Sequence, residues 1–62
     1  MTELFPAQPP TLAQMISAVE RELGMRRSVY ARRVADGKMT QAKADHEIAC
    51  MAGVLARLKE MV

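Results

Sequence analysis

Apolar residues recur every three or four positions along two stretches of the chain, which is the spacing of helices that bury one face. The first stretch predicts a helix over about residues 12–35, and the second predicts a helix over about residues 41–61. The recurring positions of the first are Leu12, Met15, Ile16, Val19, Leu23, Tyr30 and Val34. Those of the second are Ala44, Ile48, Met51, Leu55, Leu58 and Val62.

Capping and turn residues mark the ends of both predicted helices. Thr11 followed by Gln14 three residues later has the pattern of a capping box. Gly37 can close the first helix in the left-handed conformation, and Thr40 can cap the second. Because the turn over residues 36–40 is short, the helices are expected to fold back antiparallel.

The segment before Thr11 has no helical periodicity. Pro9 and Pro10 exclude a helix across their positions. Residues 1–10 are therefore predicted to form an extended, Pro-rich arm that precedes the hairpin over residues 11–62. Leu4 and Phe5 in this arm are candidates for packing on the helices or on a partner.

The apolar arc of the second helix is wider than one facing helix can cover. Cys50, Val54 and Met61 widen it on one side, and Ala52 extends it on the other. Self-association into a dimeric four-helix bundle would cover the excess. The fold class is therefore predicted to be all-α, a two-helix hairpin that dimerises. Its core or dimer seam is predicted to comprise Ile48, Met51, Val54, Leu55, Leu58 and Met61.

Size and composition agree with a small helical interaction protein. The chain has 62 residues, enough for one domain near the lower size limit for an independent core. Half of its residues are apolar, but it has one Phe, one Tyr, no Trp and six Met. Methionine side chains adapt to irregular surfaces, either in a core or on a tolerant binding face.

Positive charge is concentrated between Arg21 and Lys38. This segment contains six basic and two acidic residues and therefore has a net charge of +4. The whole chain carries only +2, so the rest carries −2. A local positive field favours anionic partners, although it is also common on solvated helices. The predicted ligand-binding or partner-binding residues are Arg26, Arg27, Tyr30, Arg33 and Lys38.

Arg26 lies inside the apolar stripe of the first helix. A charged group there needs a carboxylate, a carbonyl or an anionic ligand, because burying it unpaired is costly. Folding the hairpin places Glu47 close to the level of Arg26 and Tyr30. An internal Arg26–Glu47 or Tyr30–Glu47 contact is therefore expected.

No catalytic, metal or cofactor pattern is present. Cys50 is the single cysteine, and with His46 four residues earlier it supplies too few ligands for a zinc site. The opening residues lack the pattern of a signal peptide, and no apolar run reaches the ~20 residues that span a bilayer. The expectation is a cytoplasmic, non-enzymatic protein with no cofactor and no membrane association.

The turn and the start of the second helix carry a longer pattern, Tyr30-x3-Val34-x2-Gly37-Lys38-Met39-Thr40-x-Ala42-x-Ala44-x2-Glu47-Ile48-x2-Met51. It resembles a pattern in small helical-hairpin accessory proteins of phages and prophages. In those proteins Pro usually follows the Tyr, whereas Ala31 stands here and implies a straighter first helix. The resemblance implies a phage accessory protein in the cytoplasm of its host that binds and inhibits a host or defence protein.

Two functions follow as hypotheses. The first is a homodimeric binding module for a host protein or a small anionic ligand. The alternative is weak, sequence-tolerant nucleic-acid binding through the basic stretch of residues 21–38. Acidic residues interrupt that stretch, and no helix-turn-helix, zinc finger or aromatic RNA-binding platform is visible.

Overall fold

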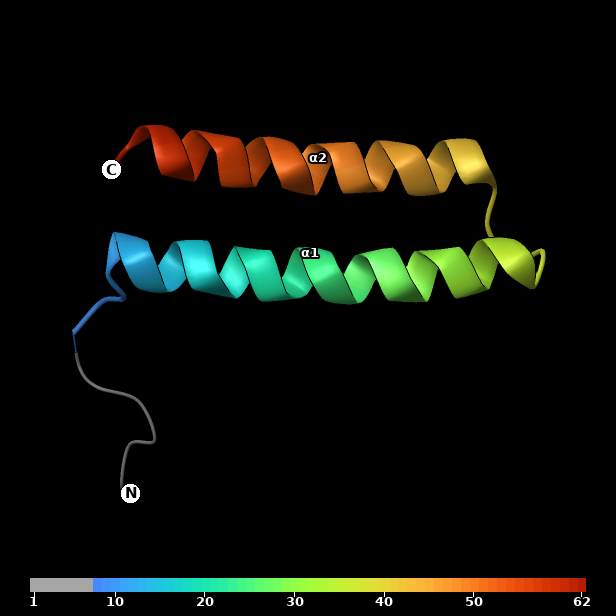
Figure 1. Ribbon diagram of the computed structural model, residues 1–62, viewed down its shortest axis with the longest axis horizontal. Helices are drawn as coiled ribbons and strands as arrows, with labels where there is room; N and C mark the ends of the chain where they lie inside the picture. Colours follow the sequence, from blue (N-terminus) through green and yellow to red (C-terminus); the bar gives the residue numbers. More distant parts are fainter. Residues whose placement is uncertain (1–7) are drawn as a thin grey trace, which may run out of the picture.

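The computed structural model describes residues 8–62, which form two α-helices and no strand. Helix α1 spans Leu12–Ala35 and helix α2 spans Gln41–Glu60. The helices lie side by side and antiparallel, so the start of α1 and the end of α2 share one end of the hairpin (Figure 1). The predicted all-α hairpin is confirmed, while Leu4 and Phe5 lie outside the described residues.

Helix α1 begins at Leu12 because Thr11 and Gln14 satisfy the first free amides of the helix. The Gln14 amide donates to Thr11 Oγ1 over 3.1 Å, and the Thr11 amide donates to Gln14 Oε1 over 2.8 Å. This reciprocal pair is the predicted capping box. The helix then runs without interruption past Ala31, where a proline would have bent it.

The turn uses the left-handed conformation of Gly37, whose φ is +71°. The Gly37 amide donates to the Val34 carbonyl over 3.1 Å, and the Lys38 amide donates to the Arg33 carbonyl over 2.8 Å. This pair of bonds is the Schellman arrangement, which ends a helix by satisfying its last carbonyls. Thr40 then caps α2 by accepting the Lys43 amide over 3.1 Å.

The seam between the helices holds very little fully buried surface. Only Leu23, at 5% exposure, and Ala44, at 4%, are buried among the described residues. The shortest dimension of the structure is 12 Å, about the diameter of one helix. The hairpin is therefore a single layer, in which each helix is covered along one side only. Half-buried residues line the rest of the seam, namely Leu12, Ile16, Val19, Arg26, Tyr30 and Val34 on α1, with Glu47, Ile48, Met51, Ala52, Leu55 and Leu58 on α2.

Candidate functional site

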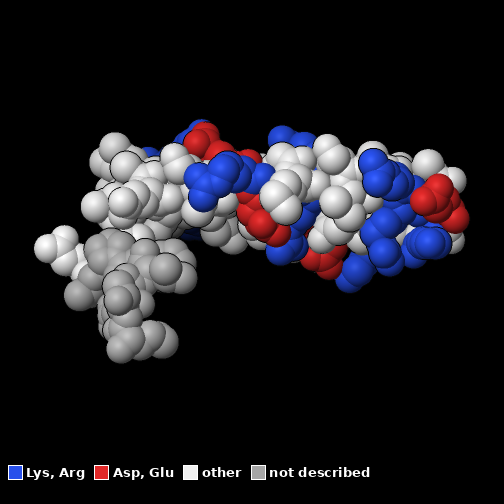
Figure 2. Space-filling view, turned by 90° about the horizontal axis from the view of Figure 1, so that it is seen from below, with Lys and Arg blue, Asp and Glu red and all other residues white. Residues whose placement is uncertain are grey.

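Basic side chains gather toward the turn end on the outer surface of α1 (Figure 2). Arg32 and Arg33 lie in the last turn of α1, and they and Lys38 are exposed. Cations at this position are favoured by the negative end of the helix dipole. Part of the positive field is therefore explained by helix stability alone, without a ligand.

Arg26 finds both of its polar partners on its own helix. Its Nε donates to Glu22 Oε1 over 2.8 Å, and its Nη1 donates to Tyr30 Oη over 3.3 Å. The hydrogen bond to Glu22, followed by the effect of Tyr30, raises the pKa of the Arg26 guanidinium above its ordinary value. Glu22, Arg26 and Tyr30 thus form a chain of polar side chains along one edge of α1.

The expected contact of Glu47 with Arg26 or Tyr30 is not formed. Glu47 Oε1 instead accepts from Lys43 Nζ over 2.8 Å, one turn earlier on α2. Residues four apart on a helix are neighbours, so each charge is paired locally without reaching across the seam. Lys43 is the main cause that lowers the pKa of the Glu47 carboxyl, while Arg26 contributes a smaller effect across the seam.

The lowered pKa of Glu47 predicts a pH dependence of stability. A carboxyl whose pKa is lower in the folded state stabilises the fold above its unfolded pKa, and this contribution is lost as the pH falls through the folded pKa. Glu47→Gln should therefore show a smaller loss of stability than the wild type between pH 6 and pH 3 in urea titrations. Glu60→Gln, on the exposed end of α2, is the control. Identical pH profiles for the wild type and Glu47→Gln would contradict this assignment.

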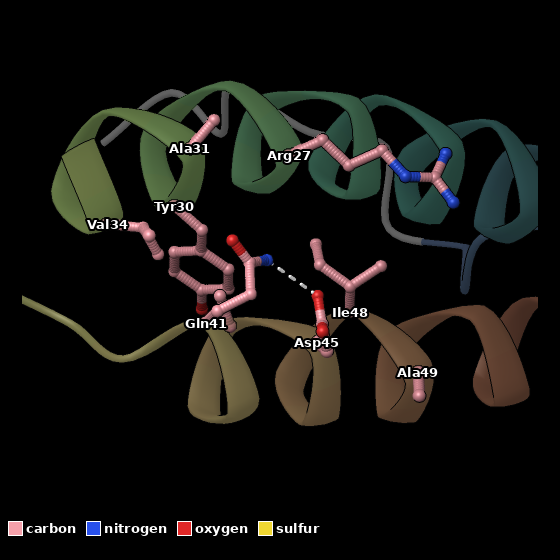
Figure 3. Close-up of a pocket in the computed structure, with 9 residues that line it drawn as sticks. Arg27, Tyr30, Ala31, Val34, Gln41, Asp45, Ile48 and Ala49 are labelled. Carbon is pink, nitrogen blue, oxygen red and sulfur yellow. Dashed lines mark hydrogen bonds between the residues drawn. The ribbon is translucent and has the colours of Figure 1, made fainter.

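An open groove of about 470 Å³ lies between the helices near the turn (Figure 3). Its floor and walls are mostly apolar, with two charged side chains at the rim. Gln41 Nε2 donates to Asp45 Oδ1 over 2.8 Å and so holds the carboxylate in place. The Arg27 side chain runs along α1 and away from Tyr30. The groove is lined by Arg27, Tyr30, Ala31, Val34, Gln41, Ala44, Asp45, Ile48 and Ala49.

The single chain does not bring the five predicted binding residues together. Arg26 and Arg27 are consecutive in α1, so their side chains diverge by about 100°. Of the five, Arg27 and Tyr30 line the groove, while Arg26, Arg33 and Lys38 do not. Sequence reasoning missed Gln41 and Asp45, whose spacing of four residues was the available signal for a helical hydrogen bond.

The predicted core or dimer seam divides into two groups. Half-buried positions that line the seam with α1 are Ile48, Met51, Leu55 and Leu58. Val54 and Met61 are instead exposed, at 48% and 68%. In the single chain these two do not contribute to the core, which leaves them available to an intermolecular contact.

The sulfur of Cys50 lies 3.6 Å from His46 Nε2, and both residues are exposed. Over residues 8–62 no group of three or more potential ligands could hold a metal ion. The same part of the chain has no helix long and apolar enough to cross a membrane.

Comparison with family models, curated proteins and solved structures found no match for this chain.

Proposed function

We propose that this chain is a non-enzymatic binding module that works as a homodimer of helical hairpins. The observation that supports this proposal is the nearly absent core, in which Leu23 and Ala44 are the only buried residues of the described chain. Domains of this size gain the missing stability from disulfides, metals or oligomerisation. Cys50 has no second cysteine to pair with, so oligomerisation is the remedy we favour.

The partner we favour is a host or defence protein, which a phage-encoded module would inhibit by binding. The resemblance of the turn region to phage accessory proteins motivates this role. The groove supports it physically, because an apolar side chain of a partner can enter it while Arg27 offers hydrogen bonds to a nearby carboxylate. A small anionic ligand could use the same Arg27 and the ring of Tyr30.

The homodimer is tested by static light scattering of nuclease-treated protein across concentrations from micromolar to millimolar. The expected result is twice the chain mass at high concentration, with thermal stability that rises with protein concentration. Mass and melting temperature that stay at monomer values over the whole range would refute the homodimer.

The groove is tested in the same dimer, with thermal shift measured against a panel of small carboxylates and phosphates. Stabilisation by one of them that is lost in Arg27→Gln would assign the groove to a small anion. The matched control is Arg21→Gln, an exposed arginine of α1 that does not line the groove.

Nucleic-acid binding is the second candidate, motivated by basic residues without ion-pair partners among residues 8–62. Arg27, Arg32, Arg33 and Lys38 belong to this group. Binding of this kind should weaken steeply as salt rises, because each neutralised phosphate releases counterions. Nucleic acid that co-purifies with the wild type, but not with Arg27→Glu plus Arg32→Glu, would promote this function. If the wild type binds no nucleic acid even at low salt, this second candidate function is refuted.

A further inference from the structure

Two rows of residues at a spacing of seven run along one side of the hairpin. On α1, Met15 and Val29 lie seven residues to either side of Glu22. On α2, Met61 lies seven residues after Val54, and Val54 lies seven after Glu47. Positions seven apart on a helix share a face, drifting by only ~20°. Most of these side chains are large, apolar and exposed.

Both rows lie on the same side of the hairpin. Glu22 of the first row is bonded to Arg26, and Glu47 begins the second row. The groove is lined by neither Arg26 nor Glu47 but by their neighbours Arg27 and Ile48, so it lies on the other side of the hairpin. We call this surface the methionine–valine face; its apolar members are Met15, Val29, Val54 and Met61, with exposures between 37% and 68%.

We propose that a second copy of this chain covers the methionine–valine face, with the two hairpins stacked so that their turns lie at opposite ends. This inference rests on the homodimer proposed above and assigns its interface. It leaves the groove, on the opposite side, free for another partner.

The size of the face suits a dimer. Helix α1 has 24 residues. Its length is therefore about 36 Å, and two helices side by side are about 20 Å wide, which gives a face of roughly 700 Å². Stable interfaces bury about 800 Å² on each partner. The Glu22–Arg26 and Glu47–Lys43 pairs neutralise four of the charges along this face. Arg33, seven residues after Arg26, is exposed and has no ion pair among residues 8–62, so stacking with the turns at opposite ends also keeps the two copies of Arg33 apart.

Charge also favours turns at opposite ends. The turn half of the hairpin, residues 24–53, has six basic and three acidic side chains, whereas the described remainder has three of each. Stacking with the turns together would superimpose two halves of net +3. Stacking with the turns at opposite ends places the positive half of each copy against the neutral half of the other copy.

The position of the two-fold axis follows from the register of the helices. The Glu20–Lys59 ion pair, with a separation of 3.5 Å, joins the helices toward the open end, and Tyr30 and Ala44 line one groove between them toward the turn. Between these points, Glu22 and Val54 lie near one level, in the middle of both rows. An axis at this level brings Val54 of one copy close to Val54 of the other.

Cysteine crosslinking tests this geometry in the full chain. In a Cys50→Ser background, Val54→Cys should form a covalent dimer under mild oxidation. Ala49→Cys, an exposed position of α2 that lines the groove, is the matched control and should stay uncrosslinked. Efficient crosslinking of Ala49→Cys with none of Val54→Cys would overturn the proposal. Val54→Cys that stays monomeric while Met61→Cys crosslinks to Met15→Cys would also overturn it, because that pairing places the turns together.

A charge at the same position gives an independent readout. Val54→Lys should raise the dimer dissociation constant at least about tenfold, since two ammonium groups then face each other across the axis. Ala49→Lys should leave it unchanged. If Ala49→Lys dissociates the dimer and Val54→Lys does not, the interface lies on the groove side and the homodimer itself still stands. If the wild type does not dimerise at any concentration, both the homodimer and the interface assigned to it are refuted. Should Val54→Lys unfold, as seen by circular dichroism, the crosslinking result decides.

Discussion

Replacing Leu23 with Ala is expected to unfold the hairpin at room temperature. Leu23, at 5% exposure, is the only large apolar side chain of residues 8–62 that is buried. Truncating a buried Leu to Ala costs about 2–5 kcal/mol, because the transfer energy is lost and a cavity remains. A single small core rarely supplies more than about 3–5 kcal/mol in total. Far-UV circular dichroism should therefore show loss of most helical signal at micromolar protein concentration.

Leu12→Ala is the matched control for this prediction. It makes the same chemical change in the same helix, but Leu12 lies in the first turn and is only half buried. The free energy of unfolding that Leu12→Ala loses should be small. The helical signal should therefore stay intact, and the urea midpoint should shift only modestly. Equal destabilisation by the two variants would show that Leu23 is not the centre of the core.

The ends of both helices could be predicted from the sequence because each is decided by neighbouring residues. Thr11 and Gln14 form their reciprocal bonds within a single turn. Gly37 adopts the positive φ that ends α1, and Thr40 caps α2. None of these interactions depends on how the helices pack. The apolar spacing then decided which sides of the helices meet.

The partner of Arg26 could not be predicted in the same way. Both Glu22, on its own helix, and Glu47, across the seam, were within plausible reach. The choice depends on side-chain geometry. Arg26 pairs with Glu22 because residues four apart on a helix are already neighbours, and Glu47 pairs with Lys43 instead. The groove was missed for a similar reason. Consecutive residues such as Arg26 and Arg27 point to different sides of the hairpin, and a count of basic residues does not separate them.

Periodicity alone also did not separate the two groups within the predicted seam of α2. Leu55 and Val54 are adjacent apolar residues of one wide arc, yet Leu55 is half buried against α1 and Val54 is exposed. A wide arc indicates only that apolar surface extends beyond the seam with the facing helix. Only the position of α1 shows that Val54 and Met61 lie outside the intramolecular seam, and this position is what makes them candidates for contact with a second copy.

Replacing Ala44 with Asp is expected to destabilise the hairpin strongly at neutral pH. Ala44 is 4% exposed and lies with Tyr30, Val34 and Ile48 at the base of the groove. The one cation that lines the groove, Arg27, extends along α1 away from Tyr30 (Figure 3), so it does not pair with a short carboxylate at this position. Such a carboxylate also reaches bulk water less easily than a longer side chain would. An uncompensated buried charge costs on the order of 3 kcal/mol. Urea titrations followed by circular dichroism should show a large shift of the midpoint at pH 7.

The same variant should recover part of its stability as the pH is lowered. Burial raises the pKa of the new carboxyl above the unfolded value of about 3.9, so the penalty is full above the raised pKa and shrinks as the pH falls toward 3.9. Ala49→Asp provides the control, since it places the same residue five positions later in α2, where the side chain is exposed. The control variant carries the same intrinsic helix propensity of Asp, but its carboxylate is exposed. Its free energy of unfolding should therefore remain close to that of the wild type at every pH. An Ala44→Asp variant whose deficit relative to the wild type is constant between pH 7 and pH 4 would mean that its carboxylate reaches solvent through the groove. The packing of α1 over Ala44 would then be looser than its low exposure indicates.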